Sequence, residues 1–417
     1  MSTMSKLLLS IFCLSAFISC QDKYTETYMA NVPVYISVEE WRANEPSIEG
    51  PEDLNDPGKI YVYNDYLFIV DRGSGIHIFN NASPASPQNL GFIQLVGCAD
   101  VAVRNDVLYV DSYLDLLSFD ITNPASPQFI CRIENAIESN AMATRSGLDE
   151  SLPIVNANGE EGVIVAWEQK EITQDAEAFT VWQLDNEASS FTSPSGGVGI
   201  GGSMAQFAID ANHLYVLRSS SITSFDLSGQ ECPEIGSEVS INWVGETIFP
   251  YDDHLFIGTT SGMMIYGLSN PTSPDFVGSV SHLTACDPVV VQDDRAYVTV
   301  RTGNGCFGQI NQLHVVDISD YSSPFTIAEY ELVNPHGLGI DGNTLFICDG
   351  EAGLKVYDAE DDMTIDENRI EHYQDIDTYD VIPLNNILIM SAEEGIYQYD
   401  YSDPSNIVEM SFLPATP

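Results

Sequence analysis

Residues 105–127 read Asn-Asp-Val-Leu-Tyr-Val-Asp-Ser-Tyr-Leu-Asp-Leu-Leu-Ser-Phe-Asp-Ile-Thr-Asn-Pro-Ala-Ser-Pro, and variants of this phrase recur along the chain. The phrase holds a polar turn, a short apolar strand, a second turn, an apolar strand that closes on an acid, and a proline turn. A repeat of about 40–50 residues indicates stacked units, because one unit of that size cannot bury its own apolar face. This repeat therefore decides the fold.

The second strand of each unit is the anchor of the pattern. Seven anchors occur, at Leu67–Val70, Leu108–Val110, Leu214–Val216, Leu255–Ile257, Ala296–Val298, Leu345–Ile347 and Leu388–Met390. A pair or triplet rich in Asn, Asp or Gly precedes each anchor, and these residues adopt the positive φ of tight turns at low steric cost. Proline turns follow several third strands, and proline ends strand pairing because it cannot donate to the ladder. Four antiparallel strands per unit, repeated around a ring, make a β-propeller.

The period predicts an all-β fold with seven four-stranded blades. The units lie near residues 58–97, 98–135, 203–243, 244–283, 285–333, 334–376 and 377–414. Residues 136–202 break the period, and the run Gly162–Trp167 could be a strand of a degenerate eighth blade. The polar pair with its anchor and the proline turn are both missing there, which favours an insertion over an eighth blade. The insertion follows an outermost strand, so we expect it to emerge on the face where the central channel opens.

The phrase resembles the LVIVD-repeat family of bacterial surface and secreted proteins, above all in Leu108–Val110 followed by Phe119–Pro127. Residues 32–35 and 57–61 also look like the lipoproteins of that family. The resemblance covers nearly all of the chain after residue 30. It implies a β-propeller at the envelope of Gram-negative bacteria. It implies no established reaction, so no catalytic residue is transferred from it.

The N-terminus has the pattern of a lipoprotein signal. Lys6 is the only charge ahead of the apolar run Leu7–Ile18, and Ser19 and Cys20 follow that run. A short apolar run that ends in a small residue and Cys is a site of cleavage and lipidation rather than a membrane span. Phe17 departs from the Leu that is usual there, and an ordinary secretory signal is the alternative. The predicted order is a signal peptide at 1–19, lipidated Cys20 with an acidic tether at 20–57, and the propeller at 58–417 with its insertion at 136–202.

The expected location is the outer membrane, with the protein facing the periplasm or the cell surface. Gln21 follows the Cys in place of the Asp that often retains lipoproteins at the inner membrane. Palmitate and related acyl chains would anchor the protein, and more than one chain is needed for stable attachment. Envelope proteins, small molecules and glycans are the expected partners.

The chain carries 62 acidic and 14 basic residues, a formal charge of −48. Such a balance excludes nucleic acid as a partner, because phosphate binding needs clustered Lys and Arg. It also argues against anionic membranes and anionic polysaccharides as direct ligands. An acidic surface keeps a protein soluble and unassociated, or it can bind divalent cations such as calcium. The run 358–380 is the densest in acids but lacks the order of a calcium-binding loop.

In a propeller the first strand of each blade lines the axis and begins at the mouth of one face. Alignment of the repeats brings ten candidates for ligand binding to this mouth or its adjacent turns: Lys59, Arg72, Asp100, Tyr113, Glu246, Asp287, Arg301, His336, Tyr379 and Asp380. Much of this rim is acidic, so a divalent cation such as calcium is the cofactor that would suit it. His336 near Asp287 could act as an acid–base pair. The sequence holds no Gly-x-Ser-x-Gly, no His-Glu-x-x-His and no phosphate-cradling loop.

Six cysteines remain beyond Cys13 and Cys20, with no Cys-x-x-Cys and no Cys/His metal pattern. Export makes disulfides possible. Cys286 opens the fifth blade at the mouth, and Cys306 lies in an enlarged loop of that blade on the same face. These two are therefore predicted to pair with each other if they pair at all. The alternative is six free and mostly buried thiols.

The leading hypothesis is a non-enzymatic binding or scaffold propeller, since the fold offers a rigid disc and many loops for partners. The alternative is an envelope hydrolase or lyase that uses the acidic mouth, with or without a divalent cation. A third hypothesis is an adhesin or an accessory of a surface complex. An enzyme predicts a deep pocket with converging titratable groups. A scaffold predicts a flat apolar or aromatic patch near Trp167 or Trp182.

Overall fold

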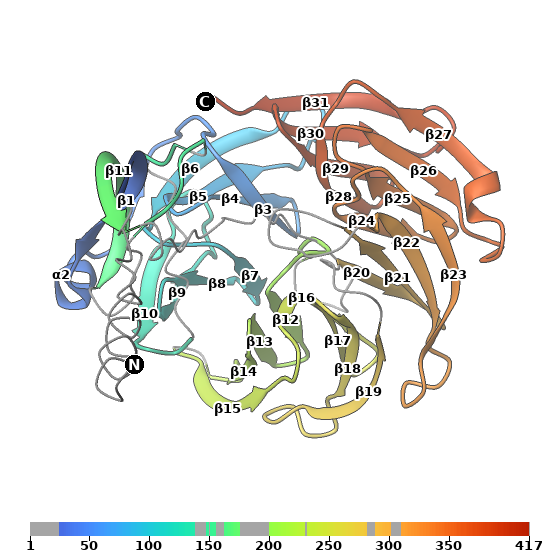
Figure 1. Ribbon diagram of the computed structural model, residues 1–417, viewed down its shortest axis with the longest axis horizontal. Coiled ribbons are helices and arrows are strands. Elements are labelled where there is room, and N and C mark those ends of the chain that lie inside the picture. Colours follow the sequence, from blue (N-terminus) through green and yellow to red (C-terminus); the bar gives the residue numbers. More distant parts are fainter. Residues whose placement is uncertain are drawn as a thin grey trace, which may run out of the picture.

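Seven four-stranded antiparallel units surround a central axis in the computed structural model, with the first strand of each unit innermost (Figure 1). The structure describes residues 25–137, 147–149, 151–155, 162–175, 200–229, 232–281, 288–301 and 310–416. The seven-bladed propeller predicted from the repeat is confirmed. The eight-bladed alternative is wrong, because the extra strand of the insertion pairs outside the ring.

The first three blades lie on either side of the insertion. Blade 1 consists of β3 (Pro57–Tyr63), β4 (Tyr66–Asp71), β5 (Gly75–Asn80) and β6 (Gln88–Gln94). Blade 2 consists of β7 (Val101–Arg104), β8 (Val107–Ser112), β9 (Asp115–Asp120) and β10 (Gln128–Ile133). Blade 3 consists of β12 (Phe207–Asp210), β13 (His213–Arg218), β14 (Ser221–Asp226) and β15 (Glu234–Ser240).

The remaining four blades follow one another without interruption. Blade 4 consists of β16 (Gly245–Tyr251), β17 (His254–Thr259), β18 (Gly262–Gly267) and β19 (Asp275–Ser281). Blade 5 consists of β20 (Val289–Gln292), β21 (Arg295–Val300), β22 (Gln312–Asp317) and β23 (Phe325–Glu331). Blade 6 consists of β24 (Leu338–Asp341), β25 (Thr344–Cys348), β26 (Leu354–Asp358), the 3-10 turn η4 (Ile365–Asn368) and β27 (Arg369–Tyr373). Blade 7 consists of β28 (Thr378–Leu384), β29 (Ile387–Ala392), β30 (Gly395–Asp400) and β31 (Val408–Pro414).

The polar pairs ahead of the anchors form the hairpin turns that the sequence predicted. Asn105 and Asp106 have φ of 50° and 60°, and Asp252 and Asp253 have φ of 47° and 54°. Positive φ at two successive residues is typical of the type I′ turn, whose twist matches that of the two strands. The anchors between these turns form the apolar core, and side chains such as Leu67 are fully buried. Burying one such side chain stabilises the fold by about 1.5–3 kcal/mol.

The acid that closes a third strand belongs to a local turn. Asp120 Oδ1 accepts hydrogen bonds from the backbone N–H of Thr122 (2.8 Å) and from its hydroxyl (2.7 Å). Asp317 Oδ1 accepts the same two bonds from Ser319, at 3.0 and 2.6 Å. These hydrogen bonds lower the pKa of both carboxyl groups, because they favour the ionised form. The acid that ends a third strand therefore stabilises the start of the proline turn rather than forming part of a binding site.

The ring closes without exchange of a strand between the two ends of the chain. Each of blades 1 and 7 is built from one continuous part of the sequence. The Thr416 N–H donates to the Leu54 carbonyl at 2.7 Å. The side-chain amides of Asn81 and Gln398 exchange two hydrogen bonds of 2.8 Å between the same blades. Hydrogen bonds outside the strand ladders therefore close the ring.

The N-terminal segment is folded, in contrast to the tether predicted at 20–57. It forms β1 (Thr25–Ile36), α2 (Val38–Ala43) and β2 (Ser47–Glu49). β1 pairs in antiparallel register with β11 (Val163–Asp175) of the insertion, and β2 adds a fifth strand to the outer edge of blade 1. We call β1 and β11 the ribbon. The strand expected at 162–167 therefore belongs to the ribbon.

Asn31 holds the ribbon to the insertion. This residue is completely buried, and its Nδ2 donates to the carbonyls of Asp149 (2.8 Å) and Leu152 (2.9 Å). Its Oδ1 accepts from the Asp149 N–H (3.0 Å) and from Gln169 Nε2 (3.1 Å). Both donor positions and both acceptor positions of this amide are therefore used.

The helix α2 attaches the ribbon to blade 2. Ser37 caps the helix by accepting the Glu40 N–H at 3.0 Å. The buried Trp41 ring stands edge-on to the Tyr113 ring, with 5.5 Å between centroids. The Arg42 guanidinium donates to both oxygens of the buried Asp115 carboxylate, at 2.9 and 2.6 Å. The contact of the Trp41 ring and the ion pair of Arg42 together hold the N-terminal segment on blade 2.

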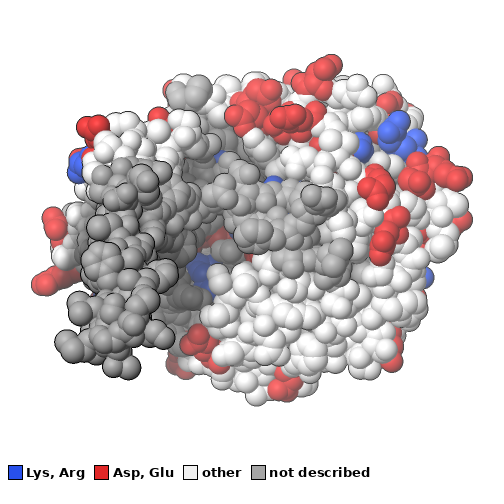
Figure 2. Space-filling view, in the orientation of Figure 1, with Lys and Arg blue, Asp and Glu red and all other residues white. Residues whose placement is uncertain are grey.

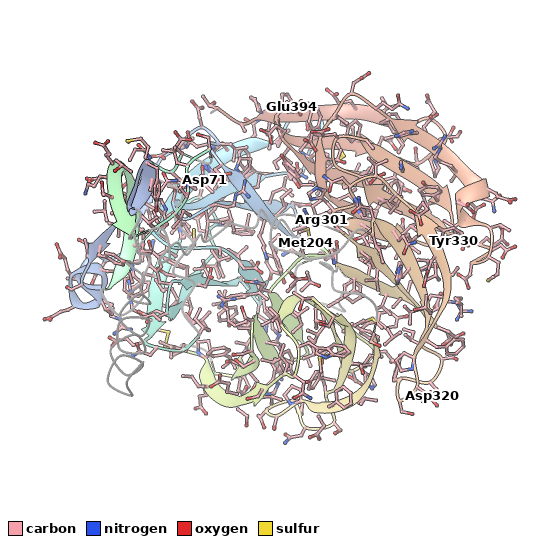
Figure 3. The ribbon with its side chains drawn as sticks, viewed as in Figure 1. Asp71, Met204, Arg301, Asp320, Tyr330 and Glu394 are labelled. Atoms are coloured by element: carbon pink, nitrogen blue, oxygen red, sulfur yellow. A yellow bond between two sulfur atoms is a disulfide. The ribbon has the colours of Figure 1, made fainter. Side chains whose placement is uncertain are left out.

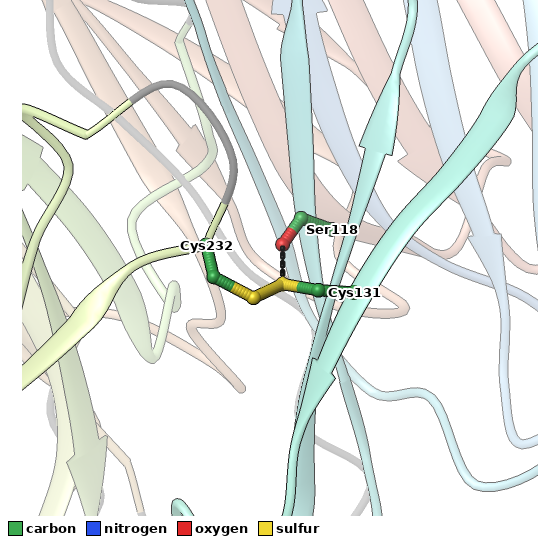
Figure 4. Close-up of a disulfide and its surroundings, with 3 residues drawn as sticks. All are labelled: Ser118, Cys131 and Cys232. Carbon is green, nitrogen blue, oxygen red and sulfur yellow. Dashed lines mark hydrogen bonds between the residues drawn. A yellow bond between two sulfur atoms is a disulfide. The ribbon is translucent and has the colours of Figure 1, made fainter.

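A disulfide joins blades 2 and 3 across the point where the insertion leaves the ring. It connects Cys131 on β10 with Cys232 just before β15, with Cα atoms 6.0 Å apart (Figure 4). Ser118 Oγ lies 3.3 Å from Cys131 Sγ. The expectation of six free thiols is therefore wrong. Sequence spacing hid this pair, because 101 positions separate the two cysteines.

The other cysteines divide into two groups. Cys98 and Cys348 are free and buried, and burial raises the pKa of both thiols. Cys286 and Cys306, which were predicted to pair, lie outside the described residues.

Removing the disulfide should destabilise the ring. In the chain-entropy model a bridge that closes a loop of about 100 residues contributes about 4–5 kcal/mol. We expect the Cys131→Ser, Cys232→Ser double variant to unfold at lower urea concentration than the wild type. Addition of a reductant should lower the midpoint of the wild type and leave that of the double variant unchanged. Equal midpoints for the two proteins under oxidising conditions would contradict the bridge.

Candidate functional site at the channel mouth

The centre of the ring is crossed by residues 200–204, which we call the plug. Ile200 exchanges two backbone hydrogen bonds of 2.6 Å with Val62 on the innermost strand of blade 1. Three residues later, Ser203 Oγ accepts the N–H of Leu338 on the innermost strand of blade 6 at 3.0 Å. The chain then enters β12 of blade 3 at Phe207, on the other side of the ring from these two blades, so the plug crosses the channel. Figure 3 shows Met204 near the centre of the ring.

The plug continues the apolar core across the axis. Ile200 is 9% exposed and belongs to the same cluster of side chains as Phe249 and Leu338. The Cα of Gly201 lies against the Tyr61 ring, where a Cβ would be 3.2 Å from the nearest ring carbon. Residues 200–204 are therefore a packed element, and they fill the channel at this point.

Lys59 and Asp100 lie at the mouth as predicted, but they are structural. Lys59 Nζ lies 2.8 Å from the Met204 carbonyl and 3.4 Å from Asp100 Oδ2, and both side chains are buried. The same carboxylate oxygen accepts the N–H groups of Gln206 (2.6 Å) and Phe207 (3.0 Å). One ion pair therefore joins blades 1, 2 and 3 to the plug.

A second buried carboxylate lies beside the first. Asp111 Oδ1 accepts the N–H groups of Ala99 (2.7 Å) and Asp100 (2.9 Å), and its Oδ2 accepts from Arg218 Nη2 of blade 3 at 2.8 Å. Burial raises the pKa of Asp111, and the Arg218 charge opposes this shift. The carboxylate attaches the start of β7 to the end of β8 in its own blade.

Blade 1 also carries a buried carboxylate at the end of its second strand, one repeat position further along than Asp111. Asp71 (labelled in Figure 3) accepts the N–H groups of Asn55 (3.0 Å) and Asp56 (3.3 Å), and its Oδ2 lies 3.1 Å from His77 Nε2. Burial of Asp71 opposes its ionisation, but the hydrogen bonds from His77, Asn55 and Asp56 outweigh burial and lower its pKa.

Blade 6 repeats this arrangement with a lysine. Asp349 accepts the N–H groups of Val333 (3.0 Å) and Asn334 (2.8 Å), and it pairs with Lys355, which occupies the place of His77. Sequence reasoning missed this group of acids. The available signal was the Asp that ends the second strand in both blades, at Leu-Phe-Ile-Val-Asp and Leu-Phe-Ile-Cys-Asp.

His336 is buried in the mouth between blades 5, 6 and 7. It is 6% exposed, and burial, together with the charge of Arg301, lowers its pKa to about 3. Asn334 Nδ2 lies 3.3 Å from its Nε2, and the ring stands 5.6 Å from the Tyr379 ring. His336 is therefore neutral near pH 7 and its Nε2 accepts a hydrogen bond.

Two further predicted residues lie near His336. Tyr379 donates its hydroxyl to Glu393, and burial followed by this carboxylate raises the pKa of the phenol. Asp380 is 5% exposed, and its carboxylate lies against Gly337, where a Cβ would meet Oδ1 at 2.1 Å. The structure thus brings Arg301, His336, Tyr379 and Asp380 together, as the alignment predicted.

Arg72 lies at the edge of this group. It pairs with Asp56 through Nε at 2.9 Å, and its charge partly offsets the rise in the pKa of the Tyr379 phenol. Tyr113 is fully buried with φ of 51°, and its hydroxyl donates to the Ile164 carbonyl of the insertion. Tyr113 is therefore a packing residue beneath α2. Glu246 is partly exposed at the start of blade 4, and Asp287 lies outside the described residues.

In the part of the chain that the structure describes, the calcium site expected from the sequence is not found. That part holds no group of three or more His, Cys, Asp or Glu side chains placed to bind a metal ion. Lys59, Arg218 and Lys355 take the position that a metal ion would have beside the buried carboxylates.

A cleft of about 430 Å³ lies away from the mouth, between α2 and the rim of blades 1 and 2. Its lining mixes apolar and polar side chains, with two charged residues: Ile36, Trp41, Ala43, Asn44, Glu45, Pro46, Ser47, Gln94, Leu95, Val96, Arg132 and Val165. Arg132 bonds to Asp115 at 3.1 Å. Converging titratable groups, which mark an active site, are not found in this cleft.

Comparison with known proteins supports the repeat and the fold. The family model described as LVIVD repeat matches residues 98–134, 248–282 and 285–331, within blades 2, 4 and 5. The chain therefore carries LVIVD repeats within a seven-bladed β-propeller. No curated protein matches it by sequence.

Three solved structures resemble the ring. A Lactobacillus plantarum protein shares 10% identity over 87% of this chain and 97% of its own, with a TM-score of 0.54. The computationally designed Ika8 protein shares 9% identity over 88% and 92%, with a TM-score of 0.53. Sqt1 of Saccharomyces cerevisiae shares 10% identity over 87% and 99%, with a TM-score of 0.50. Identities this low show the fold alone.

The Lys59–Asp100 pair provides a test of the structural role of the mouth. We expect Asp100→Asn to lower the free energy of unfolding by about 3–5 kcal/mol, because it leaves a buried Lys without its counter-charge. The Lys59→Met, Asp100→Asn double variant should be less destabilised than the single variant, as measured by urea denaturation. Calcium should not change the melting temperature of the wild type. A rise with calcium that Asp100→Asn abolishes would instead restore the cation site.

His336 should make stability sensitive to acid. Its folded pKa of about 3 lies below the ordinary histidine pKa of 6.5, so the unfolded chain binds more protons between these values. The resulting stabilisation is present above pH 6.5 and is lost as the pH falls toward 3, with a slope of up to about 1.4 kcal/mol per pH unit. His336→Gln should reduce this slope in denaturation curves measured from pH 7 to pH 4. The same slope in both proteins would contradict a neutral, buried imidazole.

Proposed function

We propose that this chain is an outer-membrane lipoprotein that acts as a non-enzymatic binding or scaffold propeller. The observation that carries the proposal is the state of the mouth, where a filled axis is surrounded by ionisable groups that bond within the protein. Such a disc offers its faces and its rim to partners, and it does not need a ligand to complete its centre.

The chemistry of the mouth supports binding over catalysis. A general base works best with a pKa near the operating pH, whereas burial and Arg301 hold the pKa of His336 at about 3. Asp100 accepts three backbone N–H groups and Asp111 accepts two, and each carboxylate pairs with a cation. These carboxylates serve as acceptors in the fold, and their oxygens are engaged before any substrate arrives.

The distribution of charge supports a docking surface on blade 4. The exposed and partly exposed turn 269–273, after β18, contains no Lys, Arg, Asp or Glu, although the chain has a formal charge of −48. Figure 2 shows a broad uncharged area over this blade, with acidic residues around it. Val244, just before β16, is 48% exposed. Cores of protein interfaces are depleted in charged residues, so this area suits a protein partner.

The aromatic patch expected of a scaffold is not at Trp167. This side chain is 3% exposed and packs with Ile154 and Ile164 in the small core of the insertion. Trp182 lies outside the described residues. The position of a docking surface therefore follows from charge rather than from these tryptophans.

The anchoring part of the proposal rests on the signal ahead of Cys20. Among the described residues, no helix is both long and apolar enough to cross a bilayer. Acyl chains on Cys20 are the attachment that we propose.

Substitution of Cys20 tests the anchor. We expect the wild type to fractionate with membranes and to incorporate a palmitate analogue, because its acyl chains partition into the bilayer. Cys20→Ala should appear in soluble fractions or accumulate as an unprocessed precursor. Cys13→Ala, in the same signal peptide, is the matched control and should behave as the wild type does.

Purification of tagged wild-type protein from crosslinked membranes then tests the binding role, with recovery of a specific envelope partner as the expected result. A Cys20→Ala chain that matures normally and stays membrane-bound would contradict lipidation. Hydrolysis of envelope glycans or peptides by the purified chain, with no partner recovered, would contradict the scaffold.

A further inference from the structure

The structured part of the chain begins very close to the proposed lipid anchor. Thr25 opens β1, and β1 pairs along its whole length with β11. Near the N-terminal end of this ladder, the hydroxyls of Thr27 and Thr173 lie 2.8 Å apart. The described chain therefore begins as one strand of a two-stranded sheet.

The ribbon is firmly attached to the ring at its other end. The buried Asn31 binds the carbonyls of Asp149 and Leu152 in the insertion, and Trp41 and Arg42 fix α2 on blade 2. The strand β2 continues the attachment by pairing with β6 of blade 1. The ribbon therefore moves with the ring as one body.

The length of chain between the anchor and the ribbon limits their separation. Four residues, 21–24, separate Cys20 from Thr25. Five Cα-to-Cα steps of a fully extended chain span at most about 18 Å. An acyl chain on Cys20 would therefore keep the start of β1 within that distance of the lipid headgroups.

We propose that the ribbon lies against the lipid surface and orients the propeller, with the rim of blades 1 and 2 toward the bilayer and blade 5 away from it. This inference rests on the proposed lipidation of Cys20. Figure 1 shows β1 and β11 beside blades 1 and 2, and β23 of blade 5 on the opposite side of the ring. The short connection, rather than attraction between charges, sets this orientation.

The side chains of the ribbon are compatible with a position near headgroups. Met29 is 45% exposed on β1. On β11, the exposed Lys170 pairs with Glu168 at 2.6 Å. The Debye length in physiological salt is about 8 Å, so the acidic blades on the far side of the ring contribute little repulsion. The orientation leaves the uncharged area of blade 4 open to a partner.

Energy transfer from the protein to the membrane tests the orientation. Lipidated protein with Cys286→Ser and Cys306→Ser would carry one dye, at Met29→Cys on the ribbon or at Glu329→Cys on β23. Both sites are exposed. In phosphatidylcholine vesicles with acceptor dyes on the headgroups, we expect several-fold more transfer from position 29 than from position 329.

The same two labelled positions, in a protein with a longer connection after Cys20, show whether the short tether or the surface of the ribbon sets the orientation. Thirty Gly and Ser residues inserted between Lys23 and Tyr24 would span about 30 Å on average, so the difference between the two positions should shrink. A difference that persists with this insertion would overturn the role of the tether. Equal transfer from both positions with the native connection would overturn the orientation while leaving lipidation intact. A chain that carries no acyl group would remove the proposed function and this inference together.

Discussion

In blades 1, 2 and 6, a carboxylate buried near the end of the second strand holds the segment that enters the blade. The segment that enters a blade has no strand beside it, and its backbone N–H groups need acceptors. Asp71, Asp111 and Asp349 each accept two successive N–H groups from that segment. A buried carboxylate is itself costly unless a cation or hydrogen bonds compensate its charge. His77, Arg218 and Lys355 are the side chains that compensate the buried carboxylates by a hydrogen bond or a charge.

This requirement explains where the few cations of an acidic protein are found. Basic side chains that pair with buried or partly buried carboxylates include Arg42, Lys59, Arg132, Arg218, Arg295 and Lys355. Basic side chains that pair with carboxylates inside the ring cannot neutralise the acidic side chains on the surface. The surface therefore carries most of the formal charge of −48, and such a surface resists non-specific association.

The repeat was sufficient to predict the blades and their hairpin turns, because both follow from local patterns that recur. It also placed Asp100, His336 and Tyr379 correctly at the mouth. Partners of these residues could not be predicted, since alignment of repeats compares equivalent positions and is blind to contacts made only once. The contacts made once are the plug, the amide of Asn31 and the disulfide of Cys131. Each joins segments separated by more than 100 positions.

The filled axis also changes which part of the molecule can vary without loss of stability. Substitutions near the plug disturb three blades at once, because Lys59 and Asp100 join them through one ion pair. In blade 4, most of the uncharged run 254–274 is buried in β17 and β18, and the carbonyls of Pro271 and Thr272 accept hydrogen bonds from Tyr215 and Ser224 of blade 3. The exposed residues of that turn carry no charge. Desolvation of charged side chains opposes association, so a surface free of them lowers the cost of binding a partner, and this face is the part of the disc best suited to that role.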